Sequence, residues 1–503
     1  MSRRGRLALV AVGGLLTLSA CGTTVPLGQQ QAAGNVMLPG TSVPSQAPGG
    51  GTTGGATSGT GAVIVGPSTG PISSSNGGGT TGSGGTTTGA QDGTTGTTAG
   101  TLGTAPGMTA TTIKIGVFTA QGFGDFAASA GFNVSTGNQQ AEAKATISWI
   151  NAHGGLAGRK IIPVFHDLNV AGAAANVDNE YASACAAWTE DNRVYAVVSP
   201  VGTVDNALYD CLSQHGVPTI AAGDSQDASF FEKYGNFYYQ PTDMNLRRIM
   251  SNLADALAPA GFFGAHPKIG VILADTANEK DAVNKGLVPA LARRGLRLAD
   301  SYAVPAGNSA ASAYSGAVLR FQAEGITHVL FTFLGSPLLF MTNAENQKYY
   351  PRYGIHSRDS PAALLQGSAP ADQQHGTMGI GWQPMNDVDS AHDPGVLNPR
   401  QRLCLKLLQE SGQAGNGRVA ALLGLWMCDN FLFLQDALSH APSFTIAGLR
   451  AGAESLGTFP SASTFRSTTG PGRLHDGAGQ YRLIAFKDDC KCYEYVSPLK
   501  TAS

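Results

Sequence analysis

The residues best suited to chemistry in this sequence are a serine, a histidine and an aspartate. Ser225 ends the tripeptide Gly-Asp-Ser, and His475 is followed directly by Asp476. A serine whose proton is taken by a histidine, which an aspartate orients, is a common nucleophile of hydrolases. These three residues make an esterase one hypothesis for the chain.

The position of Ser225 argues against an esterase. The tripeptide resembles the nucleophile block of SGNH-type esterases, but those enzymes carry the block after their first strand. Here it follows the fourth expected strand, residues 219–222, and a match of three residues arises by chance in a chain of 503. We therefore expect a protein without catalytic residues.

Cysteines are the second reactive set. The chain has seven, and without Cys21, which directly follows the expected leader, the number is even. In an exported protein an even number favours disulfides. Zinc is the weaker alternative, because no CxxC or HExxH spacing occurs, and we expect no metal and no other cofactor. The expected bridges join inward-facing residues of successive helices and leave the last two cysteines to each other: Cys185–Cys211, Cys404–Cys428 and Cys490–Cys492.

The N-terminus has the pattern of a secretory signal over residues 1–20. Three arginines precede an apolar core, and the core ends in Leu-Ser-Ala before Cys21. This ending resembles the bacterial lipobox, which implies that Cys21 carries diacylglycerol and becomes the mature N-terminus. An ordinary signal peptide is the alternative. We expect an extracytoplasmic protein on the outer face of the membrane, held by lipid only.

Residues 21–110 are a low-complexity segment of Gly, Thr and Ser. They contain no aromatic residue, and Asp92 is the only charged one. Such a segment cannot bury enough apolar surface to offset its conformational entropy, so we expect a disordered linker. A glycosylated stalk fits the same composition.

The overall charge is small. The formal net charge is -2, and 13% of the residues are charged. This balance argues against nucleic acid as a partner and favours a small molecule.

The remaining residues, from about 111 onwards, alternate between apolar strands and helices. This alternation predicts an α/β fold with parallel sheets covered by helices on both faces. Pro163 interrupts the second strand, which fits an edge position in the order 2-1-3-4-5. The expected strands of the first series are residues 113–118, 160–166, 194–199 and 219–222.

A second series of strands and helices begins near residue 268. Two long helices follow it, residues 398–410 and 418–439, and they have no sheet of their own. They must therefore return to cover a sheet already formed. The expected strands of the second series are residues 268–275, 297–304 and 326–333, and two more close the chain at 481–486 and 492–496.

Four segments carry a family resemblance: "IKIGVFTAQG", "WINAHGGLAGRKI", "AVVSP" and "TIAAGDS". In their order along the chain and in their residues, they resemble type I periplasmic binding proteins of the branched-chain amino acid, amide and urea group. The resemblance implies two doubly wound lobes, a ligand held between them, and a disulfide between the second and third helices of the first lobe. It implies three crossovers, near residues 237–242, 378–384 and 466–474. The implied lobes are residues 111–240 plus 385–465, and 241–378 plus 470–503.

In open α/β sheets, ligands bind beyond the carboxyl ends of the strands. By resemblance, Ser199 and Ser225 stand where relatives hold a ligand carboxylate. Asp224, Asp275 or Asp359 could pair a ligand ammonium, and each fits a helix cap or a turn equally well. The first helix of the second lobe lacks the aromatic residue that relatives often place there. The candidate ligand-binding residues are Gln121, Phe123, Ser199, Pro200, Asp224, Ser225, Asp275, Asn278 and Gly335.

These expectations combine into a lipid-anchored, monomeric solute-binding receptor of an ABC importer, with a membrane permease as its partner. The ligand would be a small polar compound such as an amino acid or an amide. An alternative with the same fold is a sensing ectodomain, which would work with a separate signalling protein.

Overall fold

The computed structural model describes residues 103–125, 135–202, 206–223, 226–305, 310–333, 336–366, 369–414 and 417–503. Cys21 and nearly all of the expected linker lie outside these ranges. Within them, no helix combines the length and the apolar character that crossing a bilayer requires.

The first sheet of the described chain contains parallel strands in the order β2-β1-β3-β4-β5. This confirms the order expected from the sequence. Pro163 lies on the edge strand β2, opposite Ile115 of β1, where its missing N–H is tolerated. The strands are β1 (Thr112–Thr119), β2 (Lys160–Asp167), β3 (Ala196–Ser199), β4 (Thr219–Ala221) and β5 (Tyr238–Tyr239).

Helices pack on both faces of this sheet, because successive strand residues point to opposite sides. Ala196 and Val198 of β3 belong to one buried cluster with α3 and α16 (Arg418–His440), whereas Val197 belongs to another with α4 and α5. The helices are α3 (Gln139–Ala152), α4 (Val170–Ala186) with the π-helical turn η1 (Ala187–Asp191), α5 (Ala207–Gln214) and α6 (Ala228–Tyr234).

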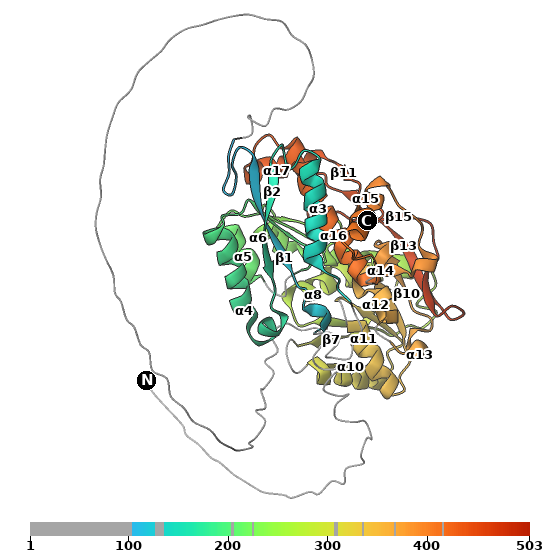
Figure 1. Ribbon diagram of the computed structural model, residues 1–503. Coiled ribbons are helices and arrows are strands. Elements are labelled where there is room, and N and C mark those ends of the chain that lie inside the picture. Colours follow the sequence, from blue (N-terminus) through green and yellow to red (C-terminus); the bar gives the residue numbers. More distant parts are fainter. Residues whose placement is uncertain are drawn as a thin grey trace, which may run out of the picture.

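Three late helices complete the first lobe: α15 (Pro399–Glu410), α16 (Arg418–His440) and α17 (Ile446–Ser455). Helix α16 contacts α3, β3 and β4, and its apolar residues join the core of the first sheet. This return, visible in Figure 1 as orange helices beside teal α3, confirms the expectation for the two long helices. Helix α17 was not expected.

The second sheet has the order β14-β13-β10-β9-β8-β6-β7. Its core strands β6 to β10 are parallel, whereas β13 runs antiparallel to β10, and β14 antiparallel to β13. The sheet is therefore mixed. The strands are β6 (Ile269–Ala274), β7 (Leu298–Val304), β8 (His328–Phe331), β9 (Arg352–His356), β10 (Met378–Gly381), β13 (Gln480–Lys487) and β14 (Cys492–Tyr495), with β15 (Lys500–Thr501) beside β13.

Helices also pack on the second sheet, and Figure 1 shows α10, α11 and α13 at the end of the molecule distant from the first sheet. Helix α7 and the α8–η2–α9 segment contribute to one buried cluster, and α10 and α11 to another. The helices are α7 (Leu246–Leu257), α8 (Ala277–Asp281), the π-helical turn η2 (Ala282–Leu287), α9 (Val288–Arg293), α10 (Ala310–Glu324), α11 (Ser336–Asn346), α12 (Pro361–Gln366), α13 (Ala371–Gln374) and α14 (Pro384–Asp387).

Three segments that cross between the lobes are hydrogen-bonded to one another. The first follows β5, where Gln240 N donates to Leu474 O over 2.7 Å. The second follows β10, where Trp382 Nε1 donates to Asp243 Oδ1 over 3.1 Å. The third is tied to the second, because Phe465 N donates to Trp382 O over 3.2 Å. Strand β10 occupies residues 378–381, so the second crossing begins later than the sequence suggested.

The glycine-rich turn after α3 has a structural role. Gly154 and Gly155 have φ angles of 94° and 67°, the left-handed conformation that ends the helix. Asn151 then joins the helix to β2, because its side chain accepts from Ile161 N over 2.7 Å and donates to Ile161 O over 3.1 Å. The side chains of this turn bind neighbouring backbone.

Three disulfides link the six described cysteines, and they are the pairs expected from the sequence. One joins α4 to α5, one joins α15 to α16, and the last lies in the turn between β13 and β14. The bridges are Cys185–Cys211, Cys404–Cys428 and Cys490–Cys492.

Candidate ligand-binding site

The carboxyl ends of β3 and β4 form the first-lobe side of the candidate site. Ser199 ends β3, and its hydroxyl donates to Val201 O over 2.5 Å and accepts from Val201 N over 3.2 Å. Asn430 of α16 donates to Ser199 O over 2.7 Å, while its Oδ1 has no hydrogen-bond partner among the described residues. The Ser199 hydroxyl therefore supports its own loop, and Asn430 brings a buried acceptor to the same edge.

Trp426 of α16 packs against the end of β4. The backbone of Gly223 approaches its ring so closely that a Cβ there would lie 3.0 Å from Trp426 Cζ3. The indole is 6% exposed, and its Nε1 has no hydrogen-bond partner in the described ranges. Trp426 thus combines an apolar face with a buried donor beside the loop that holds Pro200.

The loop after β1 carries Gln121 and Phe123, which are both partly buried. Asp167 at the end of β2 fixes this loop, because its Oδ1 accepts from Gln121 N over 3.1 Å and from Thr119 Oγ1 over 2.6 Å. The carboxylate therefore positions the backbone after β1.

In the second lobe, the first turn of α8 lies at the carboxyl end of β6. The Asp275 carboxylate forms an ion pair with Lys280. The helix is capped by Thr276, whose side chain accepts from Glu279 N over 3.3 Å. Asp275 is therefore engaged within its own loop, whereas Asn278 and Glu279 follow the cap.

Glu279 is a buried carboxyl at this edge, 8% exposed. Burial raises its pKa to about 8, and a hydrogen bond from Thr332 and the positive charge of Arg358 oppose the rise only in part. Its Oε2 has no hydrogen-bond partner among the residues described. Near pH 7 this side chain is largely protonated, so it can donate a hydrogen bond, and a cation brought close would favour its ionised form.

Arg358 follows β9 and provides a positive charge near Glu279. It is 13% exposed, and its Nη1 lies 3.6 Å from Oδ2 of Asp243, which lies in the first crossing segment. The arginine thereby connects the polar edge of the second lobe with the segments between the lobes. Movement of these segments would move the charge.

The two edges meet through a side-chain contact. Asn278 Nδ2 of the second lobe lies 3.4 Å from Oε1 of Gln226, which follows β4 in the first lobe. The segment after β4 in the first lobe thus contacts the helix that follows β6 in the second.

Three expected site residues, Asp224, Ser225 and Gly335, lie outside the described residues. Of the others, Asn278 is brought into contact with the opposite lobe, whereas Ser199 and Asp275 are engaged in their own loops. The structure adds residues that were not among the candidate ligand-binding residues, although two of them, Glu279 and Arg358, lie in the strand-end loops 275–280 and 357–359 expected from the sequence: Gln226, Glu279, Arg358, Trp426 and Asn430.

The structure does not assemble the histidine and aspartate of the esterase hypothesis. The carboxylate of Asp476 binds Arg248 over 2.8 Å and Asn245 N over 2.8 Å. The ring of His475 stacks on Phe231 at 4.8 Å, and burial lowers its pKa to about 4. Asp476 therefore does not orient the imidazole as a triad would require.

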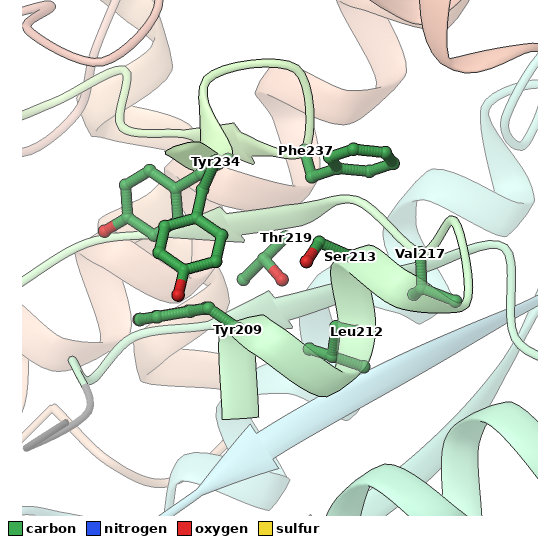
Figure 2. Close-up of a pocket in the computed structure, with 8 residues that line it drawn as sticks. Tyr209, Leu212, Ser213, Val217, Thr219, Tyr234 and Phe237 are labelled. Atoms are coloured by element: carbon green, nitrogen blue, oxygen red, sulfur yellow. The ribbon is translucent and has the colours of Figure 1, made fainter. Parts of the chain in front are cut away.

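A hollow in the first lobe is a poor ligand site (Figure 2). Its lining is apolar and aromatic, and it has no room for a molecule the size of water. Thr219 begins β4, so the hollow lies at the amino end of that strand. The residues around it are Tyr209, Leu212, Ser213, Val217, Thr219, Tyr234, Phe237 and Tyr238.

Comparisons with known proteins agree with this architecture. A family model described as periplasmic binding protein matches residues 112–479. No curated protein matched the chain.

Solved structures share the fold at low sequence identity. An ABC transporter substrate-binding protein from Desulfitobacterium hafniense, in complex with Leu, is 17% identical, covers 76% of this chain and 99% of its own, and gives a TM-score of 0.54. A solute-binding protein from Rhodopseudomonas palustris HaA2, in complex with p-hydroxybenzoic acid, is 14% identical with coverages of 78% and 98% and a TM-score of 0.58. A fatty acid ABC transporter substrate-binding protein from Thermomonospora curvata is 15% identical with coverages of 80% and 95% and a TM-score of 0.56.

Proposed function

The chain belongs to the periplasmic binding protein family, whose members are solute-binding receptors and not enzymes, and from this premise we propose that it is the lipid-anchored receptor of an ABC importer. Diacylglycerol on Cys21 would hold it at the outer face of the membrane. A separate permease would recognise the closed, ligand-bound monomer.

The contact between Gln226 and Asn278 carries this proposal. It shows that loops at the carboxyl ends of both sheets reach each other. A ligand that touches both loops would stabilise the closed arrangement by its greater affinity for it. The crossing segments would bend as the lobes approach.

We propose a small polar ligand, such as an amino acid, an amide or a related compound. Glu279 and Arg358 would face its charged or hydrogen-bonding groups, since both lie at the edge of the second lobe. Trp426 and Asn430 would bind it from the first lobe, with the apolar face of the indole against its carbon atoms. Ser225 and Gly335 remain proposed contacts of the neighbouring loops.

A ligand screen on the mature chain tests this function. Amino acids, amides, urea, aromatic carboxylates and fatty acids are compared by thermal shift and by small-angle scattering. We expect one class to raise the melting temperature and to reduce the radius of gyration. If no class does either, the proposed receptor function is wrong.

Tryptophan fluorescence then locates the ligand. A ligand beside Trp426 should change the emission of the wild type, and Trp426→Phe should remove most of that change. Trp149→Phe is the control, because Trp149 stacks on His153 of the same lobe at 4.1 Å, at the distant end of α3. An unchanged signal in Trp426→Phe would place the ligand elsewhere.

A further inference from the structure

Four side chains with metal-binding atoms lie together on the second lobe, outside the candidate ligand site. They are His392, Cys490, Cys492 and Glu494, and one ligand atom from each lies within 4.8 Å of the others. Cys490 lies in the turn between β13 and β14, and Cys492 is the first residue of β14. Ala485 of β13 pairs with the first residue of β10, so this turn lies at the amino end of β10, on the edge opposite the candidate ligand site.

The imidazole of His392 is held in one orientation. It ends the short 3-10 helix η4 (Ser390–His392), and its Nδ1 lies 2.7 Å from Oδ1 of Asp389. Its Nε2 lies 3.0 Å from Oε1 of Glu494 and 3.8 Å from Sγ of Cys492. A carboxylate on one ring nitrogen, with the other nitrogen facing further ligands, is the arrangement that surrounds zinc-binding histidines.

The set of donor atoms fits zinc. Two thiolates, one imidazole and one carboxylate supply four ligands, and Zn²⁺ binds all three types in tetrahedral sites. In the structure, however, the two sulfurs are joined to each other in the Cys490–Cys492 disulfide. The oxidised chain therefore offers only the imidazole and the carboxylate, and reduction would add two sulfur ligands.

We propose that His392, Cys490, Cys492 and Glu494 form a zinc site that opens when the Cys490–Cys492 disulfide is reduced. In the reducing step, a dithiol gives two electrons and two protons to the disulfide and becomes a disulfide itself. The Cys490 and Cys492 thiols then lose their two protons as they bind Zn²⁺. No metal was expected from the sequence, and the proposed zinc site departs from that expectation.

Reduction can be selective for this bridge. Cys490 is exposed, whereas Cys185, Cys404 and Cys428 are buried in the core of the first lobe. A thiol reductant reaches an exposed sulfur more readily than a buried one. The turn between β13 and β14 is therefore the first place where thiols are expected to form.

The site would join two different parts of the molecule. His392 lies in the segment between β10 and α15, and the next residue, Asp393, forms an ion pair with Arg418 of α16 over 2.6 Å. Glu494 belongs to β14 of the second sheet. Bound zinc would fasten the segment that leads to the first lobe onto the hairpin of the second lobe.

Zinc binding by the mature full-length chain tests the proposal. A trialkylphosphine serves as reductant; it takes an oxygen atom from water to form the phosphine oxide while the disulfide becomes two thiols. After thiol counting gives two per chain, Zn²⁺ is titrated against a chromogenic chelator, and Co²⁺ is used as a spectroscopic probe. We expect one equivalent of Zn²⁺ in the reduced protein, and tetrahedral cobalt bands with thiolate charge transfer.

Variants distinguish a zinc site formed by all four side chains from zinc captured by the two thiols alone. The unreduced protein and the Cys490→Ser/Cys492→Ser variant should bind no zinc. His392→Ala, Glu494→Gln and Asp389→Asn should each weaken binding by about tenfold or more. His375→Ala is the matched control, because His375 pairs with Asp488 of the same turn at 2.8 Å but is not in the cluster, and it should bind normally.

Two results would overturn the zinc site. One is a reduced wild type that binds no more zinc than the double serine variant. The other is His392→Ala with unchanged affinity and unchanged cobalt spectrum, which would mean that the thiols alone capture the metal. Thermal melts of each variant show that the comparison is made between folded proteins.

Discussion

Asn278 Nδ2 and Gln226 Oε1 lie 3.4 Å apart, so helix α8 of the second lobe contacts the loop that follows β4 in the first. The two residues are 52 positions apart in the sequence. In the proposed receptor, closure of the lobes would change this distance, so the contact would report closure.

Removing this contact should weaken ligand binding. Gln226→Ala and Asn278→Ala each delete one partner, at a cost of about 0.5 to 1.5 kcal/mol in the closed state. Calorimetry with the ligand found in the screen should show a loss of affinity of about two- to tenfold. Asn192→Ala is the control, because Asn192 donates to Ala187 O within the first lobe. Equal affinities in all three variants would exclude a role in closure.

Glu279 should make the stability of the free protein depend on pH. Its pKa rises from 4.5 unfolded to about 8 folded, so the folded state binds the additional proton between these values. The free energy of unfolding therefore falls as pH rises through this window, by about 1.4 kcal/mol per pH unit for this one group. The free energy of unfolding, measured with urea from pH 5 to 8, should fall less steeply in Glu279→Gln than in the wild type.

The exposed Glu410 provides the control for this pH series. In Glu410→Gln the free energy of unfolding should fall with pH as steeply as in the wild type. Glu142 contributes separately, because burial raises its pKa to about 8 as well. Glu142→Gln should flatten the profile by a similar amount. A Glu279→Gln profile parallel to that of the wild type would contradict the protonated state assigned to Glu279.

Two adjacent glycines in the turn after α3 should differ in how much stability is lost when each is replaced by alanine. A Cβ on Gly155 would lie 2.2 Å from Arg159 O, whereas a Cβ on Gly154 would meet nothing within 4 Å. Both residues have positive φ, so Gly154→Ala should cost about 1 kcal/mol, and Gly155→Ala clearly more. Thermal melts compare the two, and equal losses would argue against the close approach.

The disulfides should differ in their effect on stability according to the length of chain they close. Cys404–Cys428 spans 24 residues, so Cys404→Ala/Cys428→Ala should lose about 3 kcal/mol. Cys490–Cys492 spans only 2 residues and restricts the unfolded chain little, so Cys490→Ser/Cys492→Ser should cost much less. Denaturant midpoints measured without reductant test this order.

The sequence predicted the order of the first sheet because that information is local. Alternating apolar periods placed the first four strands, and Pro163 indicated the edge, whereas the short strand β5 lies where a crossing segment was expected. The direction of β13 was harder to predict, since an apolar strand has the same pattern whether it pairs parallel or antiparallel. The antiparallel pairing of β13 in the second sheet is therefore known only from the structure.

The site was less predictable because its walls come from distant segments. Trp426 and Asn430 lie in the middle of α16, where nothing in the pattern separates a residue facing a strand end from one in the core. Glu279 lies in a first helical turn, where a carboxylate usually interacts with the helix dipole. Burial raises the pKa of Glu279, and Thr332 and Arg358 oppose this rise; local sequence does not place these two residues beside it.

The tied crossings between the lobes have a mechanical consequence. One covalent connection would let the lobes twist, slide and swing, but three connections bonded through Gln240, Trp382 and Phe465 oppose rotation about the long axis and shear between the sheets. A single hinge-bending motion would then be left as the easiest movement between the lobes. Each opening would then present the same pair of rims to each other, without a search over orientations.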